Sequence, residues 1–227
     1  MSVVLIGAVT IGQSPRDDVV PELLSRLGSG VEIVQRGALD DLSLDFVRAH
    51  GPVTSESFLV SRMRDGTEVQ VDKGFMVPRL QAAIRAIEEK VRLILVLCSA
   101  SFDDLDSKVP LLHPAYALDQ IVTRSRVHRL GVLTPALEQV PAQRVRWQGA
   151  AEVEAAIVAA SPYEDPRALE DAATELAHNE VDFVVLDCIG YTEAMREQIE
   201  RSLIVPVVSA VGALENTTVE MLDRGIS

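Results

Sequence analysis

Two cysteines, Cys98 and Cys188, stand in the contexts of this sequence that most clearly predict chemistry. Each follows an apolar run, residues 93–97 and 183–186, and small or hydroxyl-bearing residues come soon after. A cysteine at the end of a strand, beside the backbone N–H groups of a following helix, can have its pKa lowered toward the thiolate form. Their wide separation in the chain excludes a CxxC motif or a local metal clip.

Two opposed thiols suit two-base racemisation. One thiolate removes a weakly acidic proton from carbon, and the other thiol returns a proton to the opposite face, which is a form of general acid–base catalysis. The competing interpretation is core packing, because cysteine is among the most buried residue types. The matching contexts of Cys98 and Cys188 leave these two interpretations evenly balanced.

The loop at residues 10–16 follows the first predicted strand, where ligand loops of parallel sheets lie. Gln13, Ser14 and Arg16 have side chains that can bind a carboxylate or a phosphate. The loop is neither a Walker A motif nor a GxGxxG motif. The alternative is structural: Ser14 caps a helix whose first residue is Pro15.

Other polar groups give weaker signals. Thr134 ends a predicted strand and either lines a site or caps a helix that begins at Pro135. Asp187 is expected to point away from Cys188 and to be structural, because side chains alternate along a strand. The histidines are scattered without metal-ligand spacing, and we predict no metal site.

The bulk properties exclude several classes of function. The chain has 227 residues and a formal net charge of −13, which argues against nucleic acid as a partner. Its apolar runs are too short to span a bilayer, so we expect no membrane association. It opens on an apolar run at 3–9 without preceding basic residues, which favours a first strand over a signal peptide and hence a cytoplasmic protein.

The order of predicted elements is typical of an α/β protein with mainly parallel sheets flanked by helices. An Asp-Gly turn predicts one inserted hairpin near 57–71. The segments 92–101 and 182–192 resemble each other and suggest an internal repeat. The predicted strands are 3–9, 31–35, 57–63, 67–71, 92–98, 127–133, 152–159, 181–188 and 205–208. The predicted helices are 15–27, 75–90, 110–123, 135–147, 165–178, 193–201 and 212–222.

Four features carry a family resemblance: Thr10-Ile11-Gly12-Gln13-Ser14-Pro15-Arg16, the helix after it with Leu23 and Leu24, Leu186-Asp187-Cys188-Ile189-Gly190-Tyr191, and Val205-Pro206-Val207 with Ser209. At these residues the chain resembles the AroM family and, more distantly, the aspartate/glutamate/hydantoin racemase superfamily. The resemblance implies two racemase-like lobes with pseudo-two-fold symmetry, at about 1–100 plus 205–227 and about 101–204, within a single α/β unit at 1–227.

The resemblance also implies a small carboxylate ligand, catalysis by Cys98 and Cys188 without a cofactor, and a homodimer by analogy of fold. Racemases commonly have Cys-Asn-Thr where this chain has Cys98-Ser99-Ala100. A non-catalytic, regulatory protein that binds a small carboxylate in a racemase-like cleft is the alternative. The expected substrate-binding residues are Gln13, Ser14, Arg16, Ser99, Ser101, Thr134, Gly190, Tyr191 and Thr192.

Overall fold

The computed structural model describes residues 3–151 and 154–225, and these form two compact units. One unit comprises Met1–Pro114 and Leu214–Ser227, and the other comprises Ala115–Ala213. Each is built on a parallel sheet flanked by helices, so the predicted fold class is confirmed. Within the described ranges no helix is both long enough and apolar enough to cross a bilayer.

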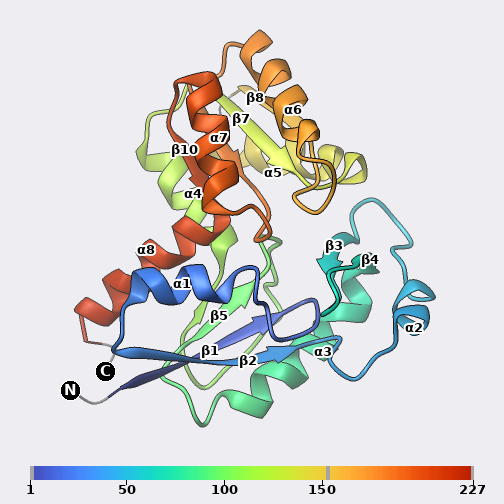
Figure 1. Cartoon of the computed structure of the whole chain (residues 1–227), viewed down its shortest axis with the longest axis vertical. Helices are drawn as coiled ribbons and strands as arrows, with labels where there is room; N and C mark the ends of the chain where they lie inside the picture. Colours follow the sequence, from blue (N-terminus) through green and yellow to red (C-terminus); the bar gives the residue numbers. More distant parts are fainter. Residues whose placement is uncertain (1–2, 152–153, 226–227) are drawn as a thin grey trace. The chain divides into compact units, whose positions relative to one another are not determined.

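The sheet of the first unit has the strand order β2-β1-β5-β6 and is parallel throughout. Helices α1 (Val20–Leu27) and α3 (Lys73–Ile87) cover opposite faces of this sheet (Figure 1). The second half of β1 is buried, as expected for a parallel strand covered on both sides. The strands are β1 (Val4–Thr10), β2 (Val31–Gly37), β5 (Ile94–Leu97) and β6 (Leu111–Leu112).

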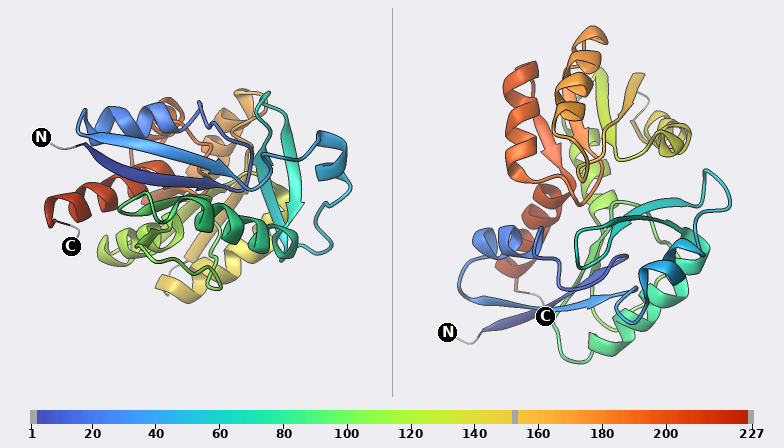
Figure 2. Two further views of the ribbon diagram at one scale, coloured as in Figure 1. Left: turned by 90° about the horizontal axis from the view of Figure 1, so that it is seen from below. Right: turned by 45° about the vertical axis from the view of Figure 1, so that its right-hand side comes forward.

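The predicted hairpin is confirmed as the antiparallel pair β3 (Phe58–Arg62) and β4 (Glu68–Asp72). Gly66 in its turn has a φ of 94°, a conformation that glycine adopts without steric cost. The hairpin packs against α3 and the short helix α2 (Leu44–Arg48) (Figure 2). Helix α2 was not predicted, because a single helical turn leaves too short an apolar pattern.

The sheet of the second unit has the strand order β10-β9-β7-β8 and is also parallel. This order repeats that of the first unit, with β7, β8, β9 and β10 in the places of β1, β2, β5 and β6. Its strands are β7 (Arg129–Thr134), β8 (Glu154–Ala159), β9 (Phe183–Leu186) and β10 (Val207–Ser209). The remaining helices are α4 (Pro114–Arg124), the 3-10 helix η1 (Leu137–Gln139), α5 (Val140–Ala151), α6 (Arg167–His178), α7 (Glu193–Leu203) and α8 (Ala210–Asp223).

The repeat extends to the register of individual residues. Gly7 of β1 pairs with Ile94 of β5, and Gly131 of β7 pairs with Val184 of β9. A Cβ atom on Gly7 would lie 2.8 Å from an isoleucine of α3, and one on Gly131 would lie 3.1 Å from a leucine of α6. In both units the central strand therefore needs glycine where a helix packs closely against it.

Several predicted boundaries were wrong. Helix α1 begins at Val20 instead of Pro15, because the preceding residues form a loop that binds other parts of the unit. Leu111 and Leu112 form an edge strand where a helix was predicted. The helix expected from Pro135 begins later, after the η1 turn. The predicted start of the β8 strand, at residues 152–153, lies outside the described residues.

Candidate functional site

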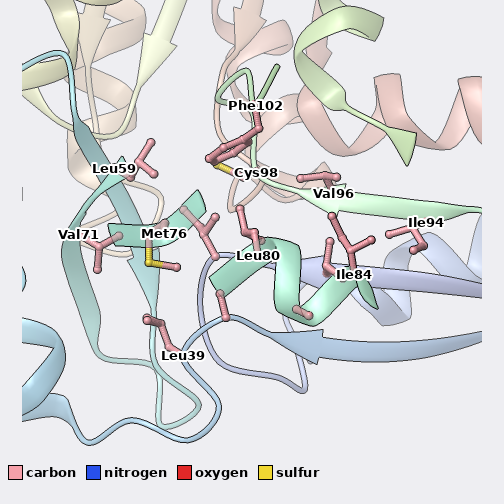
Figure 3. Packing of buried hydrophobic residues seen from close by; sticks show 14 of the residues in the cluster. Leu39, Leu59, Val71, Met76, Leu80, Ile84, Ile94, Val96, Cys98 and Phe102 are labelled. Atoms are coloured by element: carbon pink, nitrogen blue, oxygen red, sulfur yellow. The ribbon is translucent and has the colours of Figure 1, made fainter. Parts of the chain in front are cut away.

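Cys98 follows β5 directly and lies in the apolar core of the first unit. Its side chain is 7% exposed and belongs to the same buried cluster as Met76, Leu80 and Phe102. Figure 3 shows its sulfur next to Phe102. The Cys98 N–H donates to the carbonyl oxygen of Val96 at 2.9 Å, which turns the chain out of the strand.

Cys188 lies two residues after β9 and is 6% exposed. Its Sγ accepts a hydrogen bond from the backbone N–H of Gly190 at 3.4 Å. The neighbouring Tyr191 is fully buried, and its hydroxyl donates to the carbonyl oxygen of Ala160 at 2.5 Å. Burial raises the pKa of Tyr191 well above its ordinary value, and the nearby Cys188 adds to the effect. The Cys188 loop thus directs a backbone N–H at the sulfur and places a buried tyrosine close by.

The two cysteines occupy the same place in the repeated strand order. Ile94 and Val184 are equivalent, because each pairs with the corresponding glycine of the central strand. Cys98 comes four residues after Ile94, and Cys188 comes four residues after Val184. The similarity of the two cysteine contexts, noted in the sequence, therefore reflects a structural repeat.

Asp187, directly before Cys188, is held by helix α5. Its side chain is 0% exposed, and its Oδ2 accepts from Arg146 Nη1 at 2.7 Å and from Trp147 Nε1 at 3.3 Å. Arg146 also donates to Asp119 of α4 at 2.8 Å. Burial alone would lower the pKa of Arg146, but the two carboxylates outweigh it and raise that pKa. Asp187 has a structural role, as predicted, and Leu97 stands at the equivalent place in the first unit.

The polar groups of the 10–16 loop bind other parts of the first unit. Gln13 Nε2 donates to the carbonyl oxygens of Leu39 and Leu42 at 3.1 and 3.0 Å. The N–H and the hydroxyl of Ser14 both donate to the carboxylate of Asp40, at 2.6 and 2.8 Å. Ser14 therefore fastens two loops together and does not cap a helix.

Arg16 is turned inward and is only 3% exposed. Its Nη1 donates to Thr10 Oγ1 at 3.0 Å, and its Nε and Nη2 donate to Asp18 at 2.8 and 2.7 Å. Arg62 of the hairpin reaches the same carboxylate at 3.2 Å. Burial opposes the charge on Asp18, but the two arginines prevail and hold the pKa of Asp18 below its ordinary value. The structure places this arginine in an ion network that anchors the loop.

The remaining predicted residues fall into the loops beside the cysteines. Ser99 is buried and Ser101 half-buried, both just after Cys98. Thr134 is fully buried at the end of β7, where its hydroxyl donates to Oε1 of Gln139 at 3.0 Å, and it caps no helix. Thr192 follows the Cys188 loop and caps α7. The structure thus brings Gly190, Tyr191 and Thr192 together with Cys188, and Ser99 and Ser101 together with Cys98.

Tyr163, which the sequence reasoning missed, contacts the Cys188 loop. A Cβ atom placed on Gly190 would lie 2.3 Å from the Tyr163 hydroxyl oxygen. The signal that points to Tyr163 is its place shortly after the carboxyl end of β8, where ligand loops gather. Among the residues that the structure describes, no group of three or more His, Cys, Asp or Glu side chains is arranged to hold a metal ion.

Comparison with known proteins identifies the family. A model of the AroM protein family matches residues 6–222. The chain belongs to the AroM family. The search of curated proteins finds no match for this AroM-family chain.

Solved structures show what fold the AroM-family chain shares with other proteins. Allantoin racemase from Pseudomonas fluorescens is 16% identical with a TM-score of 0.66, covering 99% of this chain and 93% of its own. Maleate cis-trans isomerase from Nocardia farcinica is 17% identical with a TM-score of 0.66, covering 97% and 93%. Glutamate racemase from Bacillus anthracis is 14% identical with a TM-score of 0.63, covering 100% and 84%. At these identities the similarity is one of fold.

Proposed function

We propose that this AroM-family chain is a cofactor-independent, racemase-like or isomerase-like enzyme that transfers a proton at a carbon atom of a small carboxylate. Cys98 and Cys188 are its acid and base. The observation that carries the proposal is the repeat: two units of one strand order each have a cysteine at the same register position, just beyond the carboxyl end of the equivalent strand.

The proposed chemistry needs one thiolate and one thiol. The thiolate takes a proton from the carbon next to the carboxylate, and the electron pair left on carbon delocalises into the carboxyl group. The other thiol then gives its proton to that carbon. The hydrogen bond from the Gly190 N–H suits Cys188 to carry the negative charge, whereas the apolar surroundings of Cys98 suit it to hold a proton.

The substrate carboxylate needs donors beside the thiols. Gln13, Ser14 and Arg16 are committed to other parts of the first unit, so we assign carboxylate binding to the loops that carry the cysteines. Ser99 and Ser101 would serve on the Cys98 side. The hydroxyl of Thr192 would serve on the Cys188 side, next to the loop in which the Gly190 N–H binds the sulfur.

The similar folds support the choice of substrates to test. The neighbours are named as racemases of allantoin and glutamate and as an isomerase of maleate. Solvent deuterium incorporation into aspartate and glutamate, followed by proton NMR in D₂O, directly measures proton transfer at the carbon next to a carboxylate. Conversion of maleate is followed in the same samples.

We expect the wild-type chain to catalyse hydrogen–deuterium exchange at carbon in at least one of these compounds. The exchange rate should fall at least a hundredfold in Cys188→Ser, which is the lower end of what a general base contributes. Ser202→Ala, on the exposed face of α7, is the matched control and should keep full exchange. Full exchange in Cys188→Ser refutes the assignment. Thermal stabilisation by a carboxylate without exchange would instead identify the binding-protein alternative.

A further inference from the structure

The loop after β8 is fastened to the Cys188 loop. Strands β8 and β9 lie on either side of β7, so their loops leave the same edge of the sheet. Ala160 connects them: its N–H donates to the Thr134 carbonyl oxygen at 2.9 Å, and its own carbonyl oxygen accepts from the Tyr191 hydroxyl at 2.5 Å. Residues shortly after Ala160 are thereby held beside Cys188.

Tyr163 lies directly on the backbone of Gly190. A Cβ atom at Gly190 would lie 2.3 Å from the Tyr163 hydroxyl oxygen and 2.4 Å from its Cζ, closer than real side chains approach. The backbone of Gly190 is not in the left-handed region, so its conformation does not require glycine. The phenol of Tyr163 occupies the space that any other residue at 190 would fill.

The same glycine also contacts the sulfur, because its N–H donates to Cys188 Sγ. The Tyr163 hydroxyl and the Cys188 thiol are thus both in contact with one residue. Tyr163 is half-buried, whereas Cys188, Gly190 and Tyr191 are buried. Its N–H donates to Ser161 Oγ at 3.1 Å, which fixes the turn that brings the phenol to this place.

The two tyrosines of this cluster differ in what they can bind. The Tyr191 hydroxyl is fully buried and donates to a backbone carbonyl, so it cannot reach a ligand. Tyr163 is half-buried, so part of its side chain is accessible, and a neutral phenol can donate a hydrogen bond to a carboxylate oxygen. The position therefore suits recognition of an anion beside the thiol.

We propose that Tyr163 is a ligand-contacting residue of the Cys188 site, whose hydroxyl donates a hydrogen bond to the carboxylate of a molecule bound next to the sulfur, and that Gly190 is glycine in order to admit this phenol. The proposal deepens the proposed function and rests on it for the identity of the ligand.

Alkylation of Cys188 tests carboxylate recognition without requiring turnover. In a Cys98→Ser background, Cys188 is the only thiol, and its rates with iodoacetate and iodoacetamide are compared. Both reagents form the same C–S bond and release iodide, but only iodoacetate carries a carboxylate. Tyr163→Phe should lower the iodoacetate-to-iodoacetamide rate ratio at least fivefold, consistent with loss of a hydrogen bond to a charged group.

Two further variants give the comparison. Gly190→Ala should lower the ratio to a similar extent, because the added methyl group displaces the phenol. Tyr116→Phe, at an exposed tyrosine of α4, should leave the ratio within twofold of its parent. An unchanged ratio in Tyr163→Phe overturns the proposal, and so does a Cys188 that reacts with neither reagent. Absence of deuterium exchange in the wild-type chain would refute the enzyme but leave this ratio measurable.

Discussion

Replacing Arg146 by methionine tests the ion network beneath the Cys188 loop. Asp187 is completely buried, and Arg146 Nη1 lies 2.7 Å from its Oδ2. Methionine keeps much of the apolar stem but removes the cation that offsets the buried negative charge of Asp187. Such a loss costs about 3–5 kcal/mol. At about 2–4 °C per kcal/mol for a chain of this size, the melting temperature should fall by about 6–20 °C.

Comparison with the first unit suggests a second substitution that should compensate for this loss of stability. The first unit has Leu97 at the place of Asp187, so Arg146→Met combined with Asp187→Leu converts the charged arrangement into the apolar one. We expect the double variant to recover at least half of the lost free energy of unfolding, because a buried ion pair can often be replaced by apolar residues without loss.

Denaturant unfolding followed by circular dichroism measures these differences, with the fluorescence of Trp147, the only tryptophan, as a second probe. Arg201→Met is the matched control. That arginine side chain is 69% exposed in a surface pair with Glu197, and its loss should cost less than about 1 kcal/mol. A cost below about 1 kcal/mol for Arg146→Met, or a double variant no more stable than the single one, contradicts the reasoning.

Three further outcomes are expected. Gly12→Ala should cost about 1–3 kcal/mol, because its Cβ would lie 2.4 Å from a carbonyl oxygen of the hairpin, whereas Gly149→Ala, with open space around it, should not destabilise. Asp18→Asn should cost about 1.5–3 kcal/mol at pH 7. Folding lowers the pKa of Asp18, so the ionised carboxylate stabilises the folded protein at pH values above the ordinary pKa near 3.9. This stabilisation is lost as the pH falls through the pKa of Asp18 in the folded protein. The denaturant midpoints of the wild-type chain and Asp18→Asn should therefore converge on acidification. Tyr191→Phe should cost about 1–3 kcal/mol in thermal or denaturant unfolding by leaving a buried carbonyl oxygen without its donor.

The sequence predicted those parts of the fold whose signals are local. Buried strands such as β5 and β9 are short, uninterrupted apolar runs, and the Asp-Gly turn located the hairpin. The start of α1 could not be predicted, because Ser14 is held by Asp40, which is distant in the chain. A partner of this kind leaves no trace in the pattern of neighbouring residues.

In the candidate site, too, features with a local sequence signal could be predicted, whereas features that depend on tertiary contacts could not. The matching contexts of Cys98 and Cys188 were visible because the repeat preserves both the strand and its end. The inward turn of Arg16 was not visible, since it depends on Thr10 and Asp18 being brought together by the fold. Tyr163 was missed because its importance arises only from contact with another loop.

The division of the chain between the units has a consequence for synthesis on the ribosome. The second unit is one continuous segment, Ala115–Ala213, whereas the first also needs the last residues of the chain. Glu215 of α8, a buried carboxylate paired with Arg26 of α1, is translated only after the whole of the second unit. Chains fold from the N-terminus as they emerge. We therefore expect the second unit to complete its structure before the first, which lacks its part of α8 until the residues after Ala213 are translated.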